Sequence, residues 1–266
     1  MKVSIAYFVF SLLINALGNV LTLVTSVKVG SSFLGSAYWT AAEANLGIAL
    51  HVDLFTIFLG AGVAITILNA ILLGHWDWGR AIGNLIFMVP FSFLIQFFNN
   101  LFIPGKIFGI AMNPIINLPV AHNWMMIIFY VLLNFLGVAF IAVAISIYQR
   151  VNLVLHPADD LMQILRFKYC KGNANKAMWL SYIPPTIMGV IALAITRQFT
   201  NYGLGTIFAF LFQGGITGAS DKVVFPKLKH QALDVTPETA SSDGSNVSED
   251  IDEDIKAKDA ERDANK

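Results

Sequence analysis

Six polar or aromatic residues stand inside or beside apolar stretches, where they could contact a small solute. They are Asn15, Trp39, Glu43, Asn134, Asp159 and Gln213. Amides and carboxylates in an apolar setting can hydrogen-bond a solute or neutralise its charge, and such residues mark functional sites in membrane segments. For the amides the alternative is hydrogen bonding between helices, with Gly18 and Gly137 allowing the backbones to approach closely.

The acidic pair at 159–160 also has an explanation that requires no ligand. Asp159 and Asp160 follow Pro157, and apolar residues recur after them at helical spacing. A proline at the first helical position and carboxylates in the first turn are typical of a helix start. Gln163 stands where a metal-binding Asp-Asp-x-x-Asp pattern would have its last Asp, and His156 is the one further candidate ligand nearby. This match is too weak to predict a metal site.

The chain contains none of the short motifs that mark common enzyme classes. A Walker A pattern, His-Glu-x-x-His, Gly-x-Ser-x-Gly and paired cysteines are all absent, and Cys170 is the only cysteine. We therefore predict that the protein is not an enzyme and has no cofactor. The remaining enzymatic hypothesis, an intramembrane enzyme, would depend on Asp159.

The composition indicates a membrane protein. Of the 266 residues, 56% are hydrophobic and 13% are charged, whereas a soluble domain averages about 45–50% apolar and about 25% charged. Too few charges are present to cover a water-facing surface, and no basic patch for nucleic acid is found. The lipid bilayer is the predicted partner.

Six apolar runs are long enough to cross a bilayer, which takes about 20 residues. They cover roughly 4–26, 52–73, 81–102, 124–147, 177–196 and 204–221. The last run is interrupted by Gln213-Gly214-Gly215. The first run has an alternative interpretation as a secretory signal, because Lys2 precedes an apolar stretch and Ala16-Leu17-Gly18 resembles a cleavage site.

Lysine and arginine are distributed unevenly among the predicted loops. With the N-terminus in the cytoplasm, most basic residues, including those at 150–176 and 222–229, fall on the cytoplasmic side. Positive charge accumulates on that side of membrane proteins. We therefore expect a multi-pass protein with both termini in the cytoplasm.

Two halves of the chain resemble each other. Residues 13–18 match residues 132–137 at an offset of 119, and 82–87 match 204–208 with a three-residue slip. The repeats cover about 5–102 and 124–225. Each holds three spans, an odd number, so the second half should enter the membrane inverted, as in many transporters. Short amphipathic segments at 31–51 and 157–170 follow the first helix of each repeat, and either lie on the membrane or re-enter it.

This plan resembles the YczE/YyaS/YitT-type bacterial integral membrane proteins over about 5–225. In that family a Gly-x-Gly-Pro-Trp-Asp-like segment follows the first span of each half, and a Gly-x-Gly-Thr-like segment starts the third. Here Leu204-Gly205-Thr206 and Ile82-Gly83-Asn84 match the second element, and Ser36–Thr40 and His156–Asp159 keep parts of the first. The resemblance implies the fold and a bacterial cytoplasmic membrane, and it implies no activity.

The predicted fold is thus an all-α membrane protein with a membrane domain over 1–230 and a disordered acidic tail over 231–266. The inverted repeat favours a small-solute permease with a site between the repeats. Because the chain is short, we expect it to form a homodimer or to act together with the partner subunit of an importer. The alternative is a membrane accessory or scaffold protein that assists the assembly or export of another product.

Overall fold

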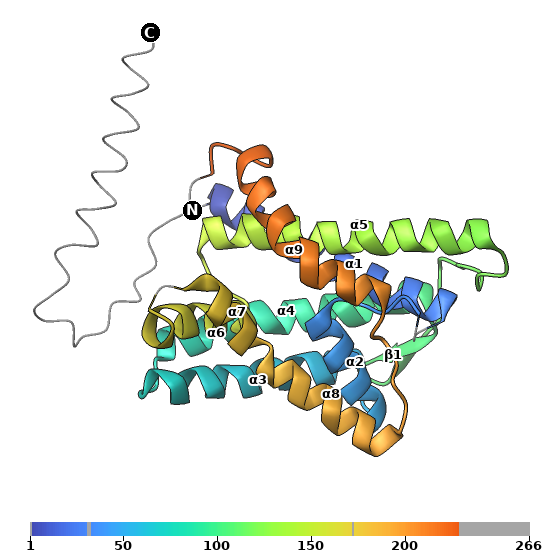
Figure 1. Ribbon diagram of the computed structural model, residues 1–266, viewed down its shortest axis with the longest axis horizontal. Helices are drawn as coiled ribbons and strands as arrows, with labels where there is room; N and C mark the ends of the chain where they lie inside the picture. The colour runs from blue at the N-terminus through green and yellow to red at the C-terminus, as the bar shows by residue number, and fades with distance from the viewer. Residues whose placement is uncertain (1, 31–32, 172, 229–266) are drawn as a thin grey trace, which may run out of the picture. The chain divides into compact units, whose positions relative to one another are not determined.

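The computed structural model describes residues 2–30, 33–171 and 173–228, and most of these are helical (Figure 1). The predicted tail, 231–266, lies outside them. The elements are α1 (Lys2–Val29), α2 (Tyr38–Leu50), α3 (Leu54–Leu73), α4 (Trp78–Phe102), α5 (Trp124–Val151), α6 (Pro157–Ile164), α7 (Ala174–Ser181), α8 (Ile183–Thr196) and α9 (Leu204–Val223). A π-helical turn (Leu165–Tyr169) follows α6, and strands β1 (Gly105–Ile107) and β2 (Ile110–Met112) form a small hairpin between α4 and α5.

Five stretches are long and apolar enough to cross a membrane. They are Val3–Val29, Leu54–Leu73, Trp78–Phe102, Trp124–Val151 and Lys176–Thr196, judged by length and composition within the described residues. The protein is therefore helical and suited to a membrane. The predicted sixth span forms α9 but does not reach the same hydropathy, because Gln213 and its neighbouring glycines dilute the apolar residues.

The fifth predicted span differs from a single straight helix. It is divided at Tyr182 into α7 and α8. Pro184 and Pro185 follow the division, and because proline has no backbone N–H, it favours the first turn of a new helix over a helix interior.

Helix starts follow local sequence signals. Asp53 accepts a hydrogen bond from the backbone N–H of Thr56, and Asp77 accepts one from that of Arg80. Asn123 does the same for Met126. Each side chain satisfies one backbone donor that the first helical turn leaves unpaired, and so sets where α3, α4 and α5 begin.

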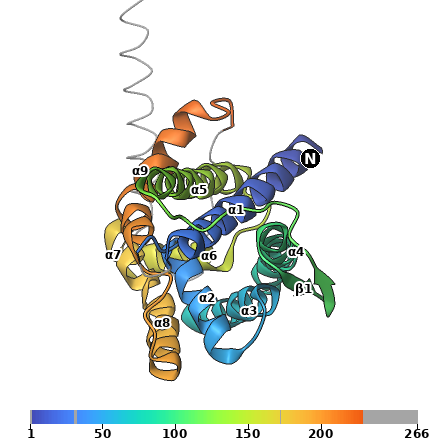
Figure 2. The ribbon, with the colours of Figure 1, turned by 90° about the vertical axis from the view of Figure 1, so that its right-hand side faces the viewer.

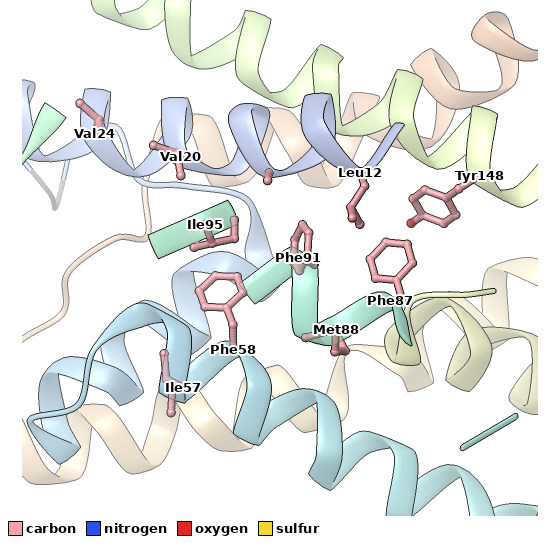
Figure 3. Packing of buried hydrophobic residues seen from close by; sticks show 11 residues of the cluster. Leu12, Val20, Val24, Ile57, Phe58, Phe87, Met88, Phe91, Ile95 and Tyr148 are labelled. Atoms are coloured by element: carbon pink, nitrogen blue, oxygen red, sulfur yellow. The ribbon is translucent and has the colours of Figure 1, made fainter. Parts of the chain in front are cut away.

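The main apolar cluster lies between α1, α3 and α4, with one residue from α5 (Figure 3). Leu12 and Phe58 are buried there with Phe87 and Phe91. The rings of Phe87 and Tyr148 meet edge to face, with their centroids 5.1 Å apart. This cluster closes one side of the central space that the helices surround.

Helices α1 and α5 cross at two glycines. A Cβ added to Gly18 would lie 2.6 Å from the carbonyl oxygen of Gly137, and one added to Gly137 would lie 2.8 Å from that of Gly18. No other residue type fits this reciprocal contact, which is the close approach that small residues permit in membrane helices. Helix α9 packs against α5 and crosses it obliquely in Figure 1, and in Figure 2 it lies on the side of α5 away from α1.

Helix α6 is held against α3 and α4 by a buried carboxylate. Asp160, 1% exposed, pairs with Arg80, and Asn84 and Asn69 donate to its other oxygen over 3.2 and 3.4 Å. The buried positions of α6, residues 157, 160, 161 and 164, follow helical spacing, as expected for an amphipathic helix.

Helix α2 is held against the segment that leads into α9. Asn45 accepts hydrogen bonds from Thr200 Oγ1 and from Asn201 Nδ2 (3.1 Å), and donates to the carbonyl of Thr200 (2.6 Å). Thr206 Oγ1 donates to the carbonyl of Ser36 over 2.6 Å. In contrast to the predicted amphipathic segment, α2 is buried from Thr40 to Asn45 without interruption, because α1, α3, α8 and α9 all contact it.

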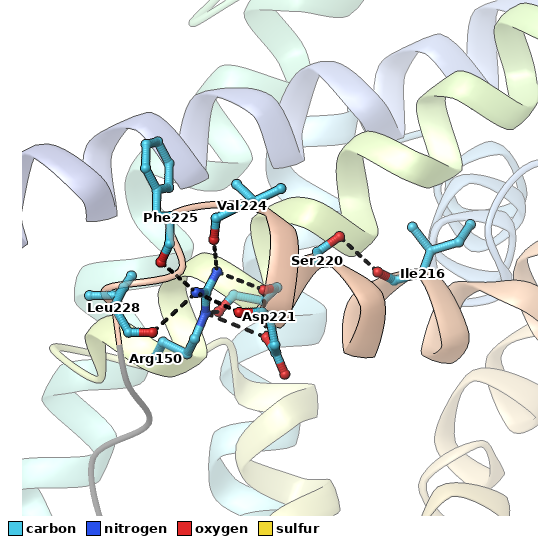
Figure 4. Close-up of polar contacts among 8 residues, drawn as sticks. Arg150, Ile216, Ser220, Asp221, Val224, Phe225 and Leu228 are labelled. Carbon is cyan, nitrogen blue, oxygen red and sulfur yellow. Dashed lines mark hydrogen bonds and ion pairs between the residues drawn. The ribbon is translucent and has the colours of Figure 1, made fainter. Parts of the chain in front are cut away.

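The C-terminal end of α9 is held by Arg150 at the end of α5 (Figure 4). This guanidinium, 1% exposed, donates to the carbonyls of Asp221, Val224, Phe225 and Leu228 over 2.9–3.3 Å. Its Nε lies 3.4 Å from Asp221 Oδ1. Arginine has five donors in a fixed plane, so one side chain satisfies the carbonyl of Asp221 in the last turn of α9 and three carbonyls of the segment that follows the helix.

Candidate functional site

A cavity of about 110 Å³ lies at the centre of the helices. Residues from α1 to α6, from the α7–α8 junction and from α9 line it. A water molecule in the liquid takes up about 30 Å³, so the cavity has room for roughly three to four water molecules. It can therefore hold a small solute.

One wall is a chain of hydrogen bonds between α2 and α1. Thr40 Oγ1 donates to Asn19 Oδ1, and Asn19 Nδ2 donates to Asn15 Oδ1 over 2.8 Å. Asn15 and Asn19 are one helical turn apart, so both face the cavity. These bonds fix the orientation of the two amides and use one acceptor position on the side-chain oxygen of each.

Glu43 projects from α2 into the same cavity. Its side chain is 4% exposed, and no described residue forms a hydrogen bond or ion pair with its carboxylate. Burial raises the pKa of this carboxyl well above its usual value. The structure therefore holds an acidic group here without a counter-charge.

A second carboxylate in the cavity lining comes from α6. Tyr148 OH donates to Asp159 Oδ2, and burial raises the pKa of Asp159 to about 6. His156 stands beside it, and its Nδ1 accepts from the backbone N–H of Ala158 over 3.2 Å. Burial lowers the pKa of His156 to about 4, so the ring is neutral at pH 7.

Aromatic rings close the remaining sides. Tyr38, Trp39 and Tyr182 line the cavity with Phe58, Phe91 and Phe210. The rings of Tyr38 and Tyr182 meet edge to face, with their centroids 4.9 Å apart. The hydroxyl groups of Tyr38 and Thr186 form a hydrogen bond of 2.7 Å. These contacts order the side chains at the junction of α2 with the α7–α8 break.

The structure brings five of the six predicted site residues together. Asn15, Trp39, Glu43, Asp159 and Gln213 line the cavity, although they come from four different helices. Gln213 stands on α9, half-buried. The pattern of polar residues in apolar runs therefore selected one place in the fold.

Asn134 lies elsewhere, fully buried at the α1–α5 crossing. Its Nδ2 donates to the carbonyl of Gly35 over 2.9 Å, to Thr25 Oγ1 over 3.0 Å and to the carbonyl of Thr22 over 3.1 Å. The side chain thus joins α5 to α1 and to the segment before α2. This geometry matches the alternative of hydrogen bonding between helices.

Sequence reasoning did not select Thr40, Tyr38 or Tyr148 as site residues, although all three line the cavity. For Tyr38 and Thr40, a hydroxyl within the predicted amphipathic segment 31–51 carries no signal of its own. For Tyr148 the partner is Asp159, 11 residues away across a loop. Only the turn of the chain between α5 and α6 brings the two side chains together.

Within the described parts of the chain, no group of three or more His, Cys, Asp or Glu side chains could hold a metal ion. Carboxylates that gather around hard cations normally supply several ligands to one ion. The two cavity carboxylates are accompanied by amides and aromatic rings instead.

A sequence model of a family of unknown function, DUF6198, matches residues 2–222, and the chain belongs to that family. The match runs from α1 through nearly all of α9. It does not carry the YczE/YyaS/YitT name, which stays a resemblance. Comparisons with curated proteins and with solved structures gave no match.

Proposed function

We propose that this DUF6198 protein is a small-solute permease of the bacterial cytoplasmic membrane, with its binding site in the central cavity. The observation that carries the proposal is a cavity lined by buried polar side chains from both predicted repeats, in a helical protein suited to a membrane. Transporters built from repeats bind their substrates where the repeats meet, near the middle of the bilayer.

We further propose that the two halves form an inverted repeat of six spans. The short helix of each half packs against the other half: α6 lies on α3, and α2 lies on α8. The first helices of the two halves cross at Gly18 and Gly137, which are equivalent in the repeat. Helix α9 has 20 residues and would serve as the sixth span, since at 1.5 Å per residue it is about 30 Å long.

Contacts at the helix ends support this topology. On one face the carbonyl of Lys28 accepts from Ala121 N over 2.8 Å, and that of Asn201 accepts from Ser36 N over 2.9 Å. On the other face Tyr169 OH donates to the carbonyl of Leu72 over 2.6 Å. An inverted six-span arrangement requires each of these pairs to lie on one side of the membrane.

The short helices α2 and α6 would form the moving parts of the site. Each carries a cavity carboxylate, and each is held by hydrogen bonds to the other half. Because the backbone of a re-entrant segment must be covered by protein, their burial against neighbouring helices suits a position within the membrane. Rocking one half against the other would then expose the cavity to alternate sides.

Uptake into proteoliposomes tests the proposed transport. The purified full chain is reconstituted and offered labelled sugars, amino acids, amines and vitamins, with empty liposomes as the baseline. Accumulation of at least one solute is expected. A control variant, Asn99→Ala, alters a half-buried amide of α4 away from the cavity and should transport normally.

The topology is tested separately by labelling single cysteines. Phe33 and Lys171 are both exposed, and each is replaced by cysteine in a Cys170→Ser background. The inverted repeat predicts that an impermeant maleimide labels the two positions from opposite faces of the membrane. Labelling from one face would refute the repeat.

The accessory or scaffold alternative predicts a different set of results. No solute would be taken up, none would raise the unfolding temperature, and a second protein would co-purify at fixed stoichiometry from native membranes. That combination would replace the permease proposal.

A further inference from the structure

The charges that face the cavity are unbalanced. Its lining contains two carboxylates, those of Glu43 and Asp159, and among the described lining residues there is no lysine or arginine. His156 is neutral at pH 7 and uses Nδ1 to accept a backbone hydrogen bond. A solute that enters therefore meets two acidic side chains and, among the described lining residues, no lysine or arginine.

Elsewhere the same fold pairs two other carboxylates, those of Asp160 and Asp221, with arginine. Asp160, as buried as Glu43, pairs with Arg80 and accepts from two asparagines. Asp221 lies 3.4 Å from Arg150. A buried charge without a partner costs several kcal/mol, so the lack of a partner at Glu43 is a specific feature of the cavity.

The cavity walls are suited to an organic group. Trp39, Tyr38, Phe58, Phe91 and Phe210 present rings to the space, and an alkylammonium group near such a ring face is attracted by the ring quadrupole. An inorganic cation would instead need several free oxygens. The side-chain oxygens of Asn15 and Asn19 already accept hydrogen bonds.

We propose that the solute is a small organic cation, an amine or a quaternary ammonium compound, whose charge is neutralised by Glu43 and whose alkyl groups contact the aromatic walls. The proposal rests on the cavity being the binding site of the permease. Asp159 supplies the second negative charge, held in position by Tyr148. The volume of about 110 Å³ limits the solute to a compact molecule.

The test compares two probes of the same shape. Choline carries a quaternary nitrogen, and 3,3-dimethylbutan-1-ol has a carbon atom in its place. Binding to the purified full chain is measured by isothermal titration and by the shift in unfolding temperature, with sodium chloride and potassium acetate at equal ionic strength as references. Choline is expected to bind at least tenfold more tightly than the alcohol.

Substitutions identify the carboxylate. Glu43→Gln keeps the shape of the side chain and removes its charge, and it is expected to weaken choline binding at least tenfold. Asp53→Asn is the matched control, because Asp53 lies outside the cavity lining and asparagine also serves as a helix N-cap. Asp159→Asn provides a second variant, with a weaker loss expected, and keeps the test decisive if Glu43→Gln does not fold.

Failure of this inference is distinguishable from failure of the permease. Equal binding of choline and its neutral isostere, or unchanged choline affinity in both cavity variants, overturns the organic cation. Uptake of a neutral or anionic solute alone also overturns it and leaves the permease in place. Cation binding that depends on Glu43, without transport in proteoliposomes, supports the site and refutes the permease.

Discussion

Asn134 joins three segments at the crossing of α1 and α5, and replacing it with alanine is expected to weaken that crossing. Its amide donates to the carbonyls of Thr22 and Gly35 and to Thr25 Oγ1. The side chain is fully buried, at 0% exposure. Asn134→Ala therefore removes all three contacts and leaves the acceptors inside the protein.

The expected cost follows from these contacts. An amide NH₂ has two hydrogens, so the three contacts amount to about two full hydrogen bonds. At about 0.6 kcal/mol for each interhelical bond in a membrane protein, they contribute about 1.2 kcal/mol. The unpaired carbonyl of Gly35 adds roughly 1–3 kcal/mol, so the total is about 2–4 kcal/mol. For a domain of this size this lowers the unfolding temperature by roughly 4–16 °C.

The assay is thermal unfolding of the purified protein in one detergent, followed by intrinsic fluorescence. Asn99→Ala serves as the matched control. Asn99 is a half-buried asparagine of α4 with no side-chain hydrogen bond to the described residues, so a change within about 0.5 kcal/mol is expected. Equal shifts in the two variants would refute the structural role. Normal stability of Asn134→Ala with loss of solute binding would show that Asn134 contacts the solute, as the sequence pattern predicted.

Three further changes test the geometry of the site and its supports. A Cβ at Gly205 would clash with Asn134 Oδ1 and lie 3.0 Å from the carbonyl oxygen of Leu34. Gly205→Ala should therefore lower the free energy of unfolding by about 1–3 kcal/mol, measured by thermal unfolding. The control is Gly214→Ala on the same helix, whose added Cβ meets nothing within 4 Å and which should be neutral or stabilising. Arg150→Lys replaces a planar five-donor group with three donors, and amide hydrogen exchange at 222–228 should become roughly thirtyfold faster, about 2 kcal/mol; unchanged exchange would contradict the role of the guanidinium. Burial raises the pKa of Asp159 to about 6, so this carboxyl is protonated below that pH and anionic above it. Choline affinity should therefore rise between pH 5 and 7. A smaller rise is expected in Asp159→Asn, where only the remaining groups titrate.

The pH dependence has a limited number of contributors among the groups around Asp159. His156 is neutral throughout this range, since its pKa is about 4. Tyr148 donates a hydrogen bond to the carboxylate, and its hydroxyl group stays protonated in this pH range. Glu43, which also lines the cavity, has its pKa raised as well. Its carboxyl gains negative charge as the pH rises, so any titration of Glu43 changes choline affinity in the same direction. An affinity that falls as the pH rises would contradict the assignment of these carboxylates to cation binding.

The order of the long helices could be read from local composition. Apolar runs of about 20 residues predict α1, α3, α4 and α5 because the bilayer selects for length and hydropathy. Local signals also mark helix starts, as Pro157 does for α6. The break at Tyr182 was missed, although Pro184 and Pro185 mark it, because hydropathy alone does not register a missing backbone donor.

The match between the two halves predicted more than the helix order. It aligned Gly18 with Gly137, and the structure places these residues in mutual contact. It also aligned Asn15 with Asn134, yet one lines the cavity and the other does not. Sequence equivalence in a repeat specifies a position on a helix, while the neighbours of that position differ between the two halves.

The sequence by itself determined that the chain is helical and suited to a membrane, where its long helices run, and which polar residues stand in apolar surroundings. These properties follow from hydropathy and from local hydrogen-bonding rules, which act within a few residues. The tertiary structure alone decided which of those polar residues face a common cavity. It also left Glu43 without a counter-charge while giving Arg80 to Asp160. Such pairings join residues dozens of positions apart, and they depend on how α2 and α6 pack against the opposite half of the chain, which local pattern does not specify.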